Sequence, residues 1–90
     1  MIEQIKVAKN SNVNAVAGSI ANAMREQDFL DIQVVGAGAL NQAIKGIAIA
    51  RGYLVPSGIE IVLFPSFKEI LINGQVKTAI KLHIKKSNKK

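Results

Sequence analysis

One segment, residues 34–58, constrains the fold of this chain more than any other. It joins the end of an apolar stretch to a Gly-Ala-Gly turn at residues 36–38, continues with apolar residues at helical spacing, and closes with Gly52 and Pro56. A strand that enters a helix through a glycine turn is typical of domains in which helices pack on a sheet. The stop signals predict a helix over residues 39–51 that ends in a left-handed conformation at Gly52.

The spacing of apolar residues predicts the other elements. Asn10, Ser11 and Asn12 are candidate N-caps for a first helix, and Asn73 with Gly74 is a strong hairpin signal. The expected elements are a strand around residues 2–7, a helix over 13–27, a strand over 31–35, the helix over 39–51, a strand buried on both faces over 59–64, a break at 65–66, and hairpin strands over 70–72 and 76–85. Because crossovers between parallel strands are right-handed, we expect both helices on one face of a four-stranded sheet, in a two-layer α+β fold.

The second expected helix carries two kinds of buried face. Leu40, Ile44 and Ile47 form a line of core residues, and beside it runs a stripe of small residues, Ala39, Ala43, Gly46 and Ala50, which lets the first helix approach closely. Ile49 lies on the opposite side of this helix and is expected to face water in a monomer. This position indicates either a subunit contact or a single exposed apolar residue of the common kind.

The charge of the chain is distributed unevenly. The formal net charge is +6, but basic and acidic residues balance over residues 1–76. The excess comes from six residues near the end, Lys77, Lys81, Lys85, Lys86, Lys89 and Lys90. These lysines either contact phosphate groups or serve as a solubilising tail and as a guard against edge-to-edge strand pairing.

Several classes of function find little support in the sequence. There is no cysteine, His83 is the single histidine, and the glycine turn lacks the third glycine of a dinucleotide-binding loop, so we expect no enzyme activity, no metal site, no cofactor and no small-molecule substrate. No apolar stretch approaches the length of a membrane span and no signal segment precedes the domain, so we expect a cytoplasmic protein without membrane contact. Aromatic residues are only 4% of the chain, which argues against base stacking.

Particular residues give the chain a family resemblance. They are the run Gly36-Ala37-Gly38-Ala39-Leu40-Asn41-Gln42-Ala43, then Lys45, Ala48-Ile49-Ala50-Arg51-Gly52 and Pro56-Ser57-Gly58, with Lys6-Val7, Lys9, Ser11 and Val16-Ala17-Gly18 before them and Gly74 with Thr78-Ala79-Ile80-Lys81-Leu82 after them. Over roughly residues 5–85 the chain resembles the bacterial stage V sporulation protein S family. The resemblance implies an Alba-like β-α-β-α-β-β domain with strand order 1-2-4-3, a homodimer, nucleic-acid binding and a role in spore development.

The resemblance also points to contacts in the turn before the first helix. The candidate nucleic-acid-binding residues are Lys9, Asn10 and Ser11 in that turn, Asn41, Gln42 and Lys45 on the second helix, and Lys68 and Lys77 on the hairpin arms. We therefore expect one Alba-like domain over residues 1–86, a flexible basic tail over residues 87–90, and binding of DNA or RNA with low sequence specificity.

Two alternatives to nucleic-acid binding stay open. The domain could recruit a protein as an interaction or assembly factor in spore development, with no direct nucleic-acid contact. It could also bind a phosphate-bearing small ligand through the backbone amides of residues 36–38, because the amino end of a helix favours an anionic group.

Overall fold

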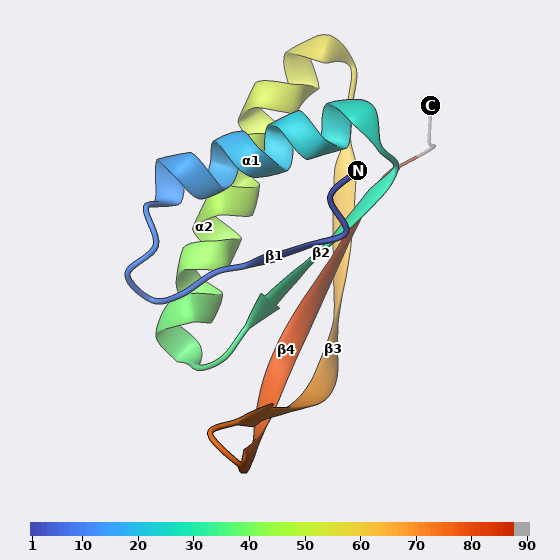
Figure 1. The fold of residues 1–90 in the computed structure, drawn as a ribbon. Coiled ribbons are helices and arrows are strands. Elements are labelled where there is room, and N and C mark those ends of the chain that lie inside the picture. The colour runs from blue at the N-terminus through green and yellow to red at the C-terminus, as the bar shows by residue number, and fades with distance from the viewer. Residues whose placement is uncertain (88–90) are drawn as a thin grey trace.

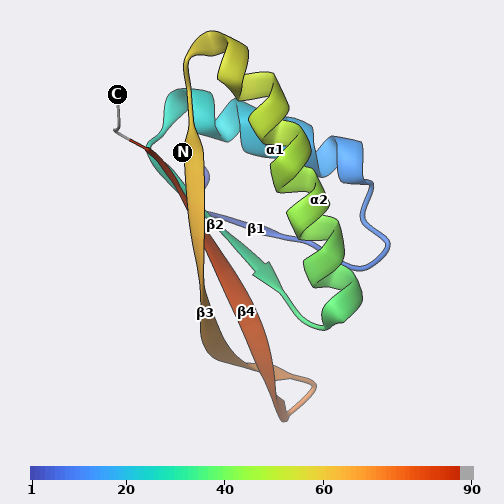
Figure 2. The ribbon, with the colours of Figure 1, turned by 180° about the vertical axis from the view of Figure 1, so that it is seen from behind.

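The computed structural model describes residues 1–87 of the chain, and the predicted two-layer α+β architecture is confirmed. The elements are β1 (Gln4–Lys6), α1 (Val13–Glu26), β2 (Phe29–Val34), α2 (Ala37–Leu54), the short 3-10 helix η1 (Val55–Ser57), β3 (Ile61–Ile72) and β4 (Gln75–Lys86). The sheet order is β1-β2-β4-β3, with β1 parallel to β2 and β4 antiparallel to both of its neighbours. Both helices cover one face of this sheet (Figure 1), and Figure 2 shows the same arrangement from behind. The far half of the β3–β4 hairpin projects beyond the helices.

Helix α1 starts where the sequence predicts. The side-chain oxygen of Asn12 accepts a hydrogen bond from the N–H of Ala15 at 2.9 Å, which satisfies one of the unpaired donors of the first turn. From there the predicted apolar stripe is buried, and Ile20 and Met24 are fully covered by the sheet and by α2. The cap fixes the start of the helix, and the stripe fixes which face meets the core.

Helix α2 is longer than predicted, and the expected stop at Gly52 is wrong. Gly52 lies inside the helix, which continues to Leu54, and the left-handed residue that ends this region is Gly58, with φ at 81°. Leu54 is fully buried, and burying a leucine side chain contributes roughly 1.5–3 kcal/mol, which favours the additional turn.

No helix within residues 1–87 is long and apolar enough to cross a membrane.

The orientation of α2 also differs from the expectation. Its buried residues are the small stripe together with Ile47 and Leu54, whereas Ile44 is 42% exposed and Ile49 packs partly buried against the core. The reason is the contact with α1, because a Cβ atom added at Gly46 would lie only 2.7 Å from Cγ1 of Val16. The small stripe therefore faces α1, and this rotates Ile44 toward solvent.

The hairpin is more continuous than predicted. The expected break at residues 65–66 is absent from the described structure, because β3 is an edge strand and Pro65 is tolerated where no neighbour needs its N–H. The expectation that residues 59–64 are buried on both faces is also wrong, since helices cover only one face and Phe64 is exposed. The predicted turn is confirmed, with Asn73 and Gly74 both at positive φ.

An ion pair ties the end of α2 to the start of β3. Nε and Nη2 of Arg51 donate to Oε2 and Oε1 of Glu60 at 2.6 and 2.7 Å. This bidentate contact lowers the pKa of Glu60, first through the hydrogen bond from Arg51 and also through its charge.

The expected tail begins directly after β4. The N–H of Ser87 donates to the carbonyl of Glu60 at 2.8 Å, and the rest of the tail, residues 88–90, lies outside the described residues.

Two of the three glycines of α2, Gly46 and Gly52, give a matched test of the helix contact. Gly46→Ala should lower the free energy of unfolding by about 1–2 kcal/mol, because the added methyl group meets the stiff side chain of Val16. Gly52→Ala, where nothing lies within 4 Å, should instead raise it by about 0.5–1 kcal/mol. Urea unfolding followed by circular dichroism measures both. Equal effects of the two substitutions would contradict the assigned packing.

The Arg51–Glu60 pair predicts a dependence of stability on pH. Because the folded-state pKa of Glu60 lies below its unfolded value, the stabilisation is present at neutral pH and is lost as the pH falls through the folded-state pKa. The difference in Tm between the parent and Glu60→Gln should therefore shrink between pH 7 and pH 3. Calorimetry at intervals across this range checks it, and a constant difference would argue against the pair.

Candidate nucleic-acid interface

The turn before α1 packs against the first turns of α2. A Cβ atom added at Gly38 would lie 2.9 Å from Cβ of Lys9, and Nε2 of Gln42 donates to the carbonyl of Ser11 at 2.8 Å. Gly38, Gln42 and Lys45 share one side of the helix, since they are spaced by four and three residues. The structure thus brings six of the predicted residues into one region: Lys9, Asn10, Ser11, Asn41, Gln42 and Lys45.

Within this region the predicted residues have different tasks. Gln42 is part-buried and holds the backbone of the loop, and the hydroxyl of Ser11 accepts a hydrogen bond from the N–H of Ala8 at 2.9 Å. Lys9, Asn41 and Lys45 are exposed. The amino end of α2 adds its own positive field, because no side chain caps it. Gln42 and Ser11 therefore shape the region, and the exposed side chains are the ones that can reach a ligand.

The other two predicted residues lie on the sheet. Residues opposite one another in an antiparallel pair share a face, and the register places Lys68 and Lys77 on the face without helices. The same register and that of β1 and β2 add Lys6, which the sequence analysis did not select, and Lys81 and Lys85, which it named only among the lysines near the end of the chain that either contact phosphate or solubilise it. On this open face, the strands carry Lys6, Lys68, Lys77, Lys81 and Lys85, with Asp31 as their one acidic residue.

A hollow connects the two groups of lysines. Its lining includes Lys6 from the open face, Lys9 from the loop before α1, and the backbone stretch of residues 70–72 near the hairpin turn. A polyanion that follows this hollow would pass from the open face of the sheet to the amino end of α2. Lys6 on the open face and Lys9 in the turn before α1 therefore line the same hollow.

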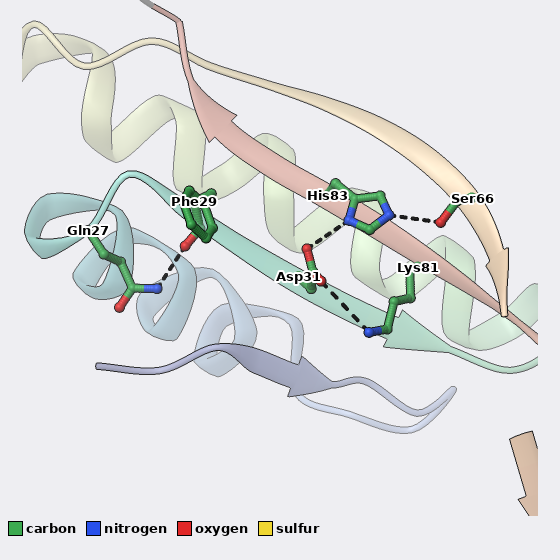
Figure 3. Close-up of polar contacts among 6 residues, drawn as sticks. All are labelled: Gln27, Phe29, Asp31, Ser66, Lys81 and His83. Carbon is green, nitrogen blue, oxygen red and sulfur yellow. Dashed lines mark hydrogen bonds and ion pairs between the residues drawn. The ribbon is translucent and has the colours of Figure 1, made fainter.

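The middle of the open face holds a hydrogen-bonded chain of three residues (Figure 3). Nδ1 of His83 lies 2.8 Å from Oδ1 of Asp31, and Nε2 of His83 lies 2.8 Å from the hydroxyl of Ser66. An ionised carboxylate only accepts hydrogen bonds, so Nδ1–H of His83 donates to it. Nζ of Lys81 is 3.7 Å from the other oxygen of Asp31. The single histidine is thus held between strands β2 and β3.

The chain has the connectivity of a serine nucleophile, its base and an orienting acid. However, the hollow beside the imidazole is lined by Asp31 and His83 but not by Ser66. Within residues 1–87 no group of three or more histidine, cysteine, aspartate or glutamate side chains is placed to hold a metal ion. The arrangement therefore fixes the position of an imidazole ring rather than presenting a nucleophile to a cavity.

Sequence reasoning missed Lys6, Lys81 and Lys85 as members of a common surface. Alternation along β4 indicates that Lys81, His83 and Lys85 share a face, but the partners of that face come from strands far apart in the chain. For example, the strand order and register place both Phe64 and Asp31 opposite His83, on either side of β4. Only the register of the whole sheet would have shown that these three lysines share a face.

The order of elements and the strand order of the sheet define an Alba-like two-layer domain. Among solved structures, Alba from Thermoplasma volcanium superposes with a TM-score of 0.64 at 11% sequence identity, over 96% of this chain and 100% of that chain, which shows the shared fold. The family model for stage V sporulation protein S matches residues 3–87. The chain belongs to the stage V sporulation protein S family, and this membership implies a role related to sporulation.

Proposed function

We propose that this protein is a homodimeric, non-enzymatic nucleic-acid-binding module that acts in the cytoplasm as a regulator of sporulation and cell development. The observations that carry the proposal are the five lysines that the register places on the open face and the hollow that one of them, Lys6, shares with Lys9 in the turn before α1. A surface with this excess of positive charge favours a polyanion.

The chemistry of the surface favours contacts to the phosphate backbone. Lysine ammonium groups on flexible stems act as point charges and carry no base-specific geometry. Each contact to duplex DNA releases counterions and contributes about 0.9 to the slope of log affinity against log salt. Binding is therefore expected to be salt-sensitive and tolerant of sequence, for DNA or RNA.

The homodimer is proposed from an exposed apolar surface on the other side of the hairpin. On the face of the hairpin opposite to the open face, Phe67, Leu71 and Val76 are 80%, 73% and 64% exposed. Ile44 on α2 adds to the apolar surface on the helix side. Uncovered side chains of this size mark an interaction surface, and the same surface on a second copy supplies a self-complementary partner. Pairing would also bring two basic surfaces into one assembly.

The same apolar surface favours the second candidate function. A protein partner that covers Phe67 and Leu71 would make the domain an interaction or assembly factor in spore development, and the lysines would only maintain solubility. The two candidates differ in what covers the hairpin, so the oligomeric state of the purified protein separates them.

Removing the charges of Lys9, in the turn before α1, and of Lys45, midway along α2, tests nucleic-acid binding. Lys9→Gln/Lys45→Gln should weaken retention of duplex DNA at low salt and reduce the salt slope by about 2, because two phosphate contacts are lost. Arg25→Glu at the far end of α1 lowers the net charge by the same amount and should leave the slope unchanged. Fluorescence anisotropy over a salt series measures both. If the double variant binds like the parent, the proposed interface is wrong.

A charge placed on the hairpin tests the dimer. Phe67→Asp should convert the protein to a monomer of 9.7 kDa, since a buried unpaired carboxylate is costly in an apolar interface. Phe29→Asp changes an exposed aromatic residue on the open face and should leave the dimer intact. Light scattering coupled to size exclusion gives the mass. A parent protein that is already monomeric would favour the interaction-factor alternative.

A further inference from the structure

The open face concentrates the aromatic side chains of a chain that has few of them. Phe29 on β2 is 68% exposed, and Phe64 on β3 is 53% exposed. They lie on either side of β4, and the ring of Phe64 stacks on His83 with centroids 5.0 Å apart and an interplanar angle of 29°. Composition alone argues against base stacking, but two of the three phenylalanines and the single histidine share this face.

Hydrogen bonds hold the imidazole ring of His83 and the backbone of Phe29. Asp31 and Ser66 fix His83 from both ring nitrogens, so the surface against which Phe64 stacks is fixed as well. Nε2 of Gln27 donates to the carbonyl of Phe29 at 2.8 Å, which anchors the start of β2 (Figure 3). A flat group that binds beside the fixed ring of His83 and the Phe64 ring stacked on it therefore loses little conformational entropy in ordering them.

A hollow of about 500 Å³ lies between the rings. Phe29, Phe64 and His83 line it together with Lys85 and Lys86. Two carboxylates also line it, Asp31, which is bonded to His83, and Asp28, which lies 3.8 Å from Nζ of Lys86, so Lys85 is the lining lysine without an acidic partner in the described structure. Its volume falls within the usual range for small-molecule sites, about 300–1,000 Å³. Aromatic surface for a base and ammonium groups for the adjoining phosphates therefore occur side by side.

We propose that the open face of the sheet binds single-stranded nucleic acid, with unpaired bases stacked at Phe29 and Phe64 and the phosphates held by the lysines around them. This inference rests on the proposed nucleic-acid binding and adds a second mode of contact to it. In a duplex, bases pair inside the stack and cannot reach flat rings on a sheet, whereas single strands can splay their bases onto such rings. The open face is therefore selective for single strands. The positive amino end of α2 attracts phosphate groups of single-stranded and duplex nucleic acid alike.

The test compares single-stranded and duplex binding by ring-deletion variants. Phe29→Ala/Phe64→Ala should weaken binding of a fluorescein-labelled single-stranded RNA and of the matching DNA strand by at least tenfold, since each stacked base contributes about 1–3 kcal/mol. Binding of the matching duplex should stay within twofold of the parent. Phe29→Tyr/Phe64→Tyr, which keeps both rings, should retain single-strand binding.

Two controls separate stacking from charge and from dimer formation. Inorganic polyphosphate carries the charge without bases, so its affinity should be the same for the parent and for Phe29→Ala/Phe64→Ala. Phe67→Ala removes an exposed ring from the helix side of the hairpin and should not reproduce the selective loss of single-strand binding. Circular dichroism of each variant verifies that the fold is retained.

The outcomes also distinguish this inference from the proposed function. If duplex and polyphosphate bind but the ring deletions leave single-strand affinity unchanged, or weaken all three ligands equally, the stacking surface is refuted while nucleic-acid binding stands. If the parent binds none of these polyanions at low salt, the proposed function itself is refuted.

Discussion

The close contact between α1 and α2 is the constraint on which the rest of the structure depends. Val16 occupies the space that a side chain at Gly46 would need, so the two helix backbones approach one another along the stripe of small residues. This contact sets the rotation of α2, which turns Ile44 outward and brings Gly38 against Lys9. The same contact that builds the core thus also assembles the basic region at the amino end of α2.

Because both helices lie on one face of the sheet, the other face is exposed to solvent. Side chains on that face do not have to fill the core, so they can be charged, polar or aromatic. The strands alternate strictly, so Leu30, Ile32 and Ile84 enter the core while their neighbours point away from it. Those neighbours include lysines, exposed phenylalanines and a histidine held from two sides. One layer of helices is therefore what makes an extended basic and aromatic surface available on so small a domain.

Local signals were sufficient for much of the fold. The Asn12 cap, the apolar stripe of α1 and the Asn73-Gly74 turn each act through neighbours within a few residues, and the structure contains all three as predicted. The end of α2 was mispredicted at Gly52 because the burial of Leu54 depends on the sheet beneath it. The continuity of β3 through Pro65 was missed because tolerance of proline depends on being an edge strand, which only the sheet order reveals.

The sequence by itself determined the two-layer class, the start of α1, the hairpin turn and the concentration of positive charge toward the end of the chain. It also placed Lys9 and Asn41 near the ends of elements that meet in space. Only the tertiary structure decided which lysines share a face, that His83 lies between Asp31 and Ser66, and that Phe29 and Phe64 flank it. The physical reason is that strand register couples residues distant in sequence, and this register is set by the packed core rather than by any local pattern.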